Sequence, residues 1–393
     1  MTNTRKKLTL PEARKLFATE RAALNFFINA FFGGKDKIHC TRCGSTNINL
    51  KAKHPTMPWR CRDCRKHFSI RTNTVMERSK LPLTEWAEML FTMSSELRSR
   101  PAKKVMNDFG HTYKTAWHMN HRIRTAFANN NAGLGKFKGT VEIDETAIGG
   151  KAKFMSPKTK RNFKERGGGT GWGGKVILAA AKERETGKIV PKVIQARDKE
   201  TLQGLVYATT LPGATVMTDE ARGYKGMTNR EHLAVNHSAK KYVDGQAHVA
   251  GVESFWSTFK HGISGSFYKI SPKHTELYAQ EFAGRQNDRN EDTFEQMDKL
   301  AKGMRGVKLP YNVLIADRGL DNFARPIGGS IKEQILFTRK KIRALKAAEK
   351  TKGLDALYKE LKELKKLDAE EKAAYVQEQQ PKVDPLPDDE IPF

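Results

Sequence analysis

Apolar side chains recur at helical spacing near the beginning of the chain. In residues 11–31 they are Leu16, Leu24, Phe27 and Ile28. Pro11 stands near the start of this stretch and Gly33 and Gly34 follow it, which is typical of the beginning and end of a helix. The pattern predicts a helix over residues 11–31, within an N-terminal helical segment of residues 1–36.

A second helical pattern extends from Leu83 to Phe127. Its apolar positions are Trp86, Met89, Leu90 and Met93, followed by Val105, Phe109, Tyr113, Trp117 and Ile123. Residues 102–119 fit a helix, a turn at Gly110 and a second helix with a basic first turn, which resembles a helix-turn-helix that enters a major groove. A plain helical connector packed by Trp86 and Trp117 explains the pattern nearly as well. We assign residues 80–130 to a helical, helix-turn-helix-like DNA-binding region.

Apolar alternation of strand type begins near residue 139. The expected strands cover residues 139–143, 175–181, 189–194 and 214–218. The second and third flank a turn at residues 185–188. The first is expected to end at Asp144 and the last at Asp219, where a buried strand meets solvent. The pattern predicts a mixed α/β domain over residues 138–292.

Polar segments interrupt and follow these elements. Residues 151–174 are basic and glycine-rich, and are expected to form a mobile loop that grips the DNA backbone. Residues 330–375 are rich in Lys and Glu and predict an amphipathic helix or short coiled coil, within a C-terminal helical extension of residues 293–380. Residues 381–393 are acidic and proline-rich, which predicts a disordered or contact tail.

The charge balance points to a polyanionic partner. The chain has 393 residues, with 71 Lys and Arg against 44 Asp and Glu, a formal net charge of +27. Nucleic acid is the commonest polyanion in a cell, although a ribosome-associated or merely solubilising surface is also basic. No apolar run approaches the roughly 18–20 residues that span a bilayer, and the polar N-terminus lacks the core of a secretory signal. We therefore expect a cytoplasmic protein without membrane contact.

All four cysteines lie in one short segment. Cys40 and Cys43 form one Cys-x-x-Cys pair, Cys61 and Cys64 form a second, and residues 44–60 separate them. This is the spacing of a zinc ribbon, in which four thiolates close a tetrahedral structural Zn²⁺ site. Two redox-active pairs are the competing interpretation, but the strand-to-helix context of such motifs is absent from the sequence. We predict a zinc ribbon over residues 37–72.

Three widely spaced carboxylates are the candidate catalytic residues: Asp144, Asp219 and Glu253. Lys260 lies about two helical turns after Glu253, so both are expected to project from one helix face. Carboxylate oxygens are the ligands of hard divalent cations such as Mg²⁺ or Mn²⁺. A pair of such metals promotes displacement at a phosphodiester, so the three carboxylates predict a two-metal site for DNA cleavage.

Several motifs in a fixed order resemble a known family. They are residues 141–150, 218–224, 235–238, 248–260, 271–274 and 281–285. Together they look like bacterial insertion-sequence DDE transposases of the ISXO type, and the resemblance covers about residues 15–290. It implies a multidomain α+β protein with a zinc ribbon ahead of a ribonuclease H-like catalytic domain.

The resemblance also implies an activity and its partners. Members nick transposon ends in a Mg²⁺-dependent reaction and transfer the freed 3′ hydroxyl into target DNA. A homodimer or higher oligomer on DNA and a bacterial, nucleoid-associated location follow by analogy. Family members often have Asn at the position of Ala250, sometimes counted as the third metal ligand. We assign that role to Glu253 rather than His248, because Mg²⁺ prefers oxygen to imidazole.

Four residues are candidate DNA contacts: Lys260, Arg285, His237 and Lys175. For three of them the sequence allows an ordinary structural role instead of a contact with DNA. Lys260 is also readable as a solvated lysine, Arg285 as the partner of Glu281 in an ion pair, and His237 as a satisfied core histidine. These alternatives stay open on the sequence alone.

Three functions compete. The first is a transposase that performs both cleavage and strand transfer. The second is a non-catalytic DNA-binding descendant of a transposase, which Ala250 favours and the intact carboxylates oppose. The third is a nuclease without strand transfer, which uses the same carboxylates and is therefore poorly separated from the first.

Overall fold

The computed structural model describes most of the first 316 residues. The described residues are 6–96, 98–149, 157, 161, 175–194, 196–219, 222–235, 249–267, 270–316, 355, 358, 361–363 and 365–366. The chain divides into two compact units, Met1–Pro326 and Ile327–Phe393. The described residues of the second unit are helical, and the rest of the predicted helix over residues 330–375 lies outside the described residues. The acidic tail also lies outside them, as does the basic loop apart from residues 157 and 161.

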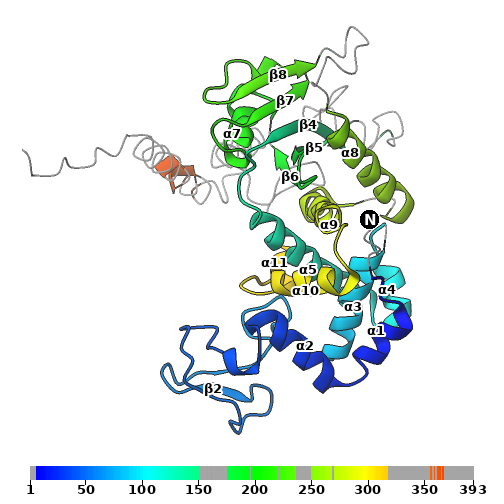
Figure 1. The fold of residues 1–393 in the computed structure, drawn as a ribbon, viewed down its shortest axis with the longest axis vertical. Helices are drawn as coiled ribbons and strands as arrows, with labels where there is room; N and C mark the ends of the chain where they lie inside the picture. Colours follow the sequence, from blue (N-terminus) through cyan, green and yellow to red (C-terminus); the bar gives the residue numbers. More distant parts are fainter. Residues whose placement is uncertain are drawn as a thin grey trace, which may run out of the picture. The chain divides into compact units, whose positions relative to one another are not determined.

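Helices from both ends of the first unit build one apolar core (Figure 1). They are α1 (Leu10–Leu16), α2 (Glu20–Phe32), α3 (Leu83–Ser95), α4 (Ala102–Phe109), α5 (Tyr113–Ala132) and α10 (Thr293–Gly303). The helix predicted over residues 11–31 is in fact two helices. Thr19 begins the second of them, because its side chain accepts a hydrogen bond of 3.2 Å from the backbone N–H of Ala22.

The helix that follows the sheet domain, α10, packs against the N-terminal helices. Three apolar side chains of α10, Met297, Leu300 and Ala301, are buried in the core of the helical region, together with its C-cap residue Met304. The helix packs on α2, α3 and α5. A short helix, α11 (Tyr311–Ile315), follows. The first unit therefore includes α10, which supplies part of the surface that covers the N-terminal helices.

A small three-stranded antiparallel sheet forms between α2 and α3 in the sequence. Its strands are β1 (Ile48–Asn49), β2 (Trp59–Cys61) and β3 (His67–Phe68), in the order β1-β2-β3. Trp59 is buried between Phe32 and Phe68, with ring centroids 6.1 and 5.5 Å away. These two aromatic residues of the ribbon, Trp59 and Phe68, therefore pack its core.

A five-stranded mixed sheet forms the second core. Its strands are β4 (Thr140–Ile148), β5 (Val176–Glu183), β6 (Ile189–Ile194), β7 (Thr215–Asp219) and β8 (Glu231–Val235). They lie in the order β6-β5-β4-β7-β8. The first three are antiparallel neighbours, whereas β7 runs parallel to both β4 and β8. The predicted strand pair around residues 185–188 is confirmed as β5 and β6.

Helices cover both faces of this sheet (Figure 1). On one face, α7 (Lys199–Thr209) packs on Val141, Ile143 and Val216. On the other, α8 (Ala250–Gly262) and α9 (Thr275–Asn287) pack on Leu178 and Ala180. The remaining described elements are the short helical turns η1 (Lys35–Lys37), η3 (Arg222–Tyr224), η5 (Ile263–Phe267) and η6 (Pro272–His274). No helix among the described residues is long and apolar enough to cross a membrane.

A buried charge cluster joins α5 to α9. The carboxylate of Glu281 is fully buried and accepts from Arg124 at 2.8 Å and from Arg285 at 2.6 Å. Burial disfavours the charge of Glu281, but the two guanidinium groups lower its pKa. The Arg124 guanidinium also lies over the ring of Tyr278, 3.9 Å from its centroid. Helical region and sheet domain are thus linked by paired charges.

The same helix pair sets a stability test. A Cβ at Gly284 of α9 would lie 2.3 Å from the ring of Phe127 on α5, whereas a Cβ at Gly204 of α7 would meet nothing within 4 Å. We expect Gly284→Ala to lower the free energy of unfolding by about 1–3 kcal/mol through overpacking. The matched Gly204→Ala should raise it by about 0.5–1 kcal/mol through helix propensity. Urea unfolding measures both, and equal effects would show that α5 and α9 are not in close contact.

Candidate active site

Two of the candidate carboxylates lie on neighbouring strands. β4 and β7 pair in parallel, with Val141 opposite Val216 and Glu142 opposite Met217. Continuing this register by two residues places Asp144 beside Asp219. Asp219 is the last residue of β7, as expected, and its side chain is 31% exposed. The pairing of two parallel strands therefore brings together residues that are far apart in the sequence.

The expectation that Asp144 ends its strand is wrong. β4 continues to Ile148, because every residue from Val141 to Ile148 pairs with β5 and the last of them lies opposite Val176. Asp144 therefore stands in mid-strand and is half-buried. It lies opposite Ala180, which packs with α8 and α9. Its side chain accordingly belongs to the sheet face that carries α8.

The third carboxylate comes from the first turn of α8. Glu253 is exposed there, and Lys260 is exposed in the last turn of the same helix. Ala250 is the first residue of α8, one helical turn before Glu253. The preceding residue, Val249, offers no side-chain cap to the helix.

A buried glutamate of β4 supplies the missing cap. Glu142 Oε2 accepts a hydrogen bond of 3.1 Å from the backbone N–H of Val252, and its other oxygen accepts from Arg184 at 2.7 Å. Lys182 Nζ donates to the carbonyl of Gly251 at 3.0 Å. Glu142 stands two residues before Asp144 on the same strand face. The turn that carries Glu253 is thus fastened to the strand that carries Asp144.

The charges of the three carboxylates interact. Burial raises the pKa of Asp144 to about 7, and the negative charges of Glu145, Asp219 and Glu253 add to the increase. The three carboxylates do not, however, form a group whose oxygens all lie within 4.8 Å of one another; among the described residues, only the cysteines form such a group. Repulsion among the negative charges of these acids disfavours ionisation of Asp144, and a bound cation would relieve that repulsion.

The opposite face of β4 carries a second acid in a different environment. Glu145 is buried and accepts hydrogen bonds from the hydroxyl of Tyr224 and, at 2.9 Å, from Arg197 Nε. Another nitrogen of Arg197 lies 3.9 Å from Asp219 Oδ2. Burial raises the pKa of Glu145, while Tyr224 and Arg197 oppose that increase. Arg197 therefore links the buried Glu145 to the candidate ligand Asp219.

The candidate DNA contacts differ in how they are placed. Lys175 is half-buried beside Gly149, immediately before β5, and Lys260 is exposed on α8. The side chain of Arg285 is only 9% exposed and forms an ion pair with Glu281, which is the alternative that the sequence left open. His237 and His248 lie outside the described residues.

Sequence reasoning missed Glu142, Lys182, Arg184 and Arg197. Glu142 alone has a sequence signal, since it precedes Asp144 by two positions within a strand pattern and so shares its face. The others act through contacts between residues far apart in the chain.

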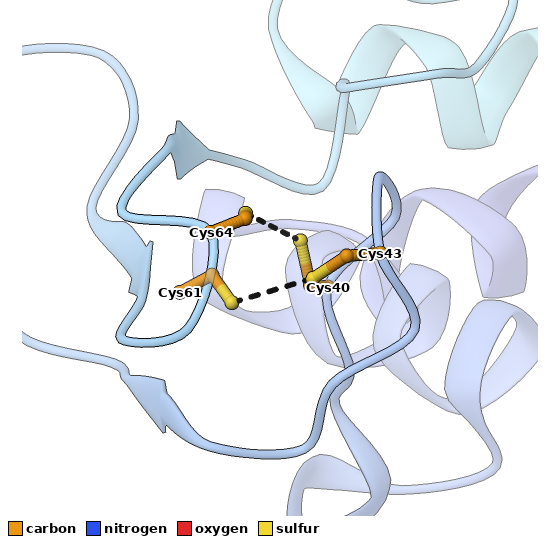
Figure 2. A group of neighbouring side chains, drawn as sticks. All are labelled: Cys40, Cys43, Cys61 and Cys64. Carbon is orange, nitrogen blue, oxygen red and sulfur yellow. Dashed lines mark hydrogen bonds between the residues drawn. The ribbon is translucent and has the colours of Figure 1, made fainter.

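The four cysteines form a separate candidate metal centre (Figure 2). Their sulfur atoms all lie within 4.8 Å of one another, with Cys40 and Cys64 3.7 Å apart and Cys43 and Cys61 3.6 Å apart. A tetrahedron with Zn–S bonds of about 2.3 Å has edges of about 3.8 Å. None of the four forms a disulfide. The donor set and its spacing thus fit a structural zinc ion.

Comparison with known proteins shows what the central domain is similar to. Residues 136–287 match the ISXO2-like transposase domain. A protein of Halobacterium salinarum, described as an uncharacterized protein in transposable element ISH50, is 25% identical over 262 residues, or 64% of this chain and 85% of that protein. No solved structure matches the chain. The two matches confirm the resemblance to insertion-sequence DDE transposases of the ISXO type. They support a transposase as the class of this protein, with an ISXO2-like domain that contains Asp144, Asp219 and Glu253.

The pKa of Asp144 predicts a pH-dependent stability. Because the folded pKa of about 7 exceeds the ordinary value of 3.8, the folded state binds more protons between these pH values, and stability falls as the pH rises through them. Asp144→Asn removes this penalty. Without added divalent cation, we expect its Tm to exceed that of the wild type by roughly 2–6 °C at pH 8 and to match it at pH 4.

Calorimetry at the two pH values checks this difference. Asp298→Asn, on α10, is the control and should show no such change with pH. Added Mg²⁺ should raise the Tm of the wild type at pH 8 more than that of Asp144→Asn. Identical pH profiles for Asp144→Asn and wild type would show that Asp144 carries no buried charge.

Metal content tests the cysteine site. We expect one zinc per chain in the purified wild type, and a loss of most of it in Cys61→Ser, because Cys61 is fully buried among the other three thiols. Elemental analysis measures the zinc. Ser45→Ala, beside the site, keeps all four sulfurs and should keep the metal. Full zinc content in Cys61→Ser would rule out a four-thiolate site.

Proposed function

We propose that the protein is a DNA transposase that binds transposon ends, nicks them by two-metal hydrolysis and transfers the freed 3′ hydroxyl into target DNA. The observation that carries the proposal is the parallel pairing of β4 with β7, which sets Asp144 beside Asp219 within the matched domain. The strand order β6-β5-β4-β7-β8, with β7 and β8 parallel to β4, supports the ribonuclease H-like fold that the family implies.

Asp144, Asp219 and Glu253 are the proposed ligands of Mg²⁺ or Mn²⁺. Their oxygens are hard donors, and the mutual repulsion that raises the pKa of Asp144 favours a cation between them. When bound, the metal pair activates the attacking oxygen of the displacement and stabilises the leaving oxygen.

Some of the surrounding residues position the three carboxylates, and others are proposed to bind the DNA. Glu142 and Lys182 fix the first turn of α8, and hence Glu253. Arg197 lies beside Asp219 and is itself held by Glu145. Lys260 extends from the same helix as Glu253 and is proposed to bind a phosphate near the cut. Lys175, immediately before β5, and His237 are further proposed DNA contacts.

The zinc ribbon and the assembly complete the proposal. The ribbon is proposed to help recognise transposon ends, with four thiolates as the structural zinc ligands. Synapsis of two ends requires at least a homodimer by family analogy. The protein is proposed to act in the bacterial cytoplasm at the nucleoid, where its DNA partners are.

The alternative is a non-catalytic DNA-binding descendant. The observation that favours it is Ala250, whose methyl group stands one helical turn before Glu253 and cannot bind a metal. In the proposed enzyme, Glu253 provides the third ligand. A nuclease without strand transfer is the remaining possibility and is separated by its products.

Cleavage of cognate DNA tests the proposal. The protein is incubated with fragments carrying the ends of its element, with Mg²⁺ or Mn²⁺, and nicked and joined products are separated on gels. We expect nicking to fall at least 100-fold in Asp219→Ala, because a metal ligand is lost, with DNA binding retained. Asp298→Ala, which removes an acid from α10, should cut as the wild type does.

The possible products separate the three functions. Nicks together with joined strands support a transposase, and nicks alone indicate a nuclease. Binding without any product indicates the non-catalytic descendant. Undiminished nicking by Asp219→Ala would remove the carboxylates from the mechanism.

A further inference from the structure

A basic cleft lies on the helical region, lined by residues of α5, the segment before α3 and the segment that follows α10. It has a volume of about 790 Å³. The residues that line it include five cations, Arg78, Lys80, Lys114, Arg122 and Lys308, and one acid, Glu77. That acid is paired with Lys308 at 2.7 Å. The cleft therefore carries a clear excess of positive charge, even for so basic a protein.

One face of α5 forms a wall of the cleft. Lys114, His118 and Arg122 are spaced four residues apart and so lie on one helix face. The segment after α10 crosses this face: His118 Nε2 lies 2.7 Å from the carbonyl oxygen of Leu309, and Lys114 Nζ lies 4.3 Å from the ring centroid of Tyr311. This part of α5 is thus held against another segment of the chain, which opposes its insertion into a major groove as a recognition helix.

The polar groups that line the cleft favour a ligand that is negatively charged and accepts hydrogen bonds. Lys114 and Thr115 stand in the first turn of α5, where the helix dipole is positive. Lys80 and Lys114 are exposed, so their ammonium groups are accessible donors in the cleft. A phosphodiester oxygen is negatively charged and only accepts hydrogen bonds. The lining is therefore complementary to a sugar-phosphate backbone.

We propose that this cleft binds the phosphodiester backbone of DNA, without reading base sequence, at a place distinct from the carboxylate site. The inference rests on the proposed function in that DNA is the partner. Lysine and arginine contacts to phosphate release counterions, so their removal changes the salt dependence of binding. Backbone contacts position a protein on DNA and weaken equally for all sequences when they are lost.

Charge-neutralising variants of the full chain test the cleft. Lys80→Gln/Lys114→Gln removes two exposed cations from it, and Lys15→Gln/Arg21→Gln removes two exposed cations from α1 and α2 as a matched control. Fluorescence anisotropy with duplex DNA, without added divalent cation, gives the affinity at several salt concentrations. We expect the cleft variant to bind about tenfold more weakly near 0.1 M salt, with a log–log salt slope reduced by about 0.9 per lost contact. The control should match the wild type.

A single substitution guards against a folding artefact. Arg78 is exposed and has a positive φ of 59°, in the left-handed region. Asn tolerates that region, so Arg78→Asn removes one charge of the cleft with little backbone strain. It should keep the Tm of the wild type and lose about 0.9 of the salt slope.

Two sequences of duplex separate the outcomes. Equal loss on a transposon end and on an unrelated duplex supports backbone binding, whereas loss on the end alone overturns that part of the proposal. Wild-type affinity and slope in both cleft variants would overturn the site while leaving the proposed function intact. A wild type that binds no duplex at all would instead defeat the proposed function.

Discussion

The carboxylate of Glu281, buried between the guanidinium groups of Arg124 and Arg285, is the contact on which the first unit depends most. Removing one member of such a buried cluster costs about 3–5 kcal/mol, because a desolvated charge is left without its partner. The cluster joins α5, which lines the basic cleft, to α9, which packs on the sheet that carries the carboxylates. The same contact explains why the motif at residues 281–285 is present: Glu281 and Arg285 pair, Phe282 packs and Gly284 lets α5 approach.

Acidic and basic side chains gather in different parts of the first unit. Asp144 is half-buried near other acids and carries a raised pKa, whereas cations gather in the cleft along α5 and, in Lys182 and Arg184, behind the first turn of α8. The acids repel one another and attract cations, while the basic surface attracts a polyanion. A protein built this way is suited to bring a metal ion and a phosphodiester together, although each is held by a different set of side chains.

Local sequence patterns were sufficient to predict some features of the fold and of the candidate site, but not those that depend on contacts between distant residues. The cysteine spacing, the end of β7 at Asp219 and the helix at Glu253 follow from neighbours in the sequence, and the structure has all three. The length of β4 could not be predicted, because its last residues are held by pairing with β5 beyond a long intervening segment. The cap that Glu142 provides for Val252 joins residues 110 positions apart. The place of α10 depends on helices at the other end of the chain.

The cap from Glu142 has a consequence for how such a domain can change. The first turn of α8, which carries Glu253, is held by contacts to the strands β4 and β5, through Glu142, Arg184 and Lys182. Glu142 and Asp144 stand on one face of β4, so a shift of α8 along the sheet would break the cap and carry Glu253 away from Asp144. The strand that bears one carboxylate thus also sets the register of the helix that bears another, and the two can change only together.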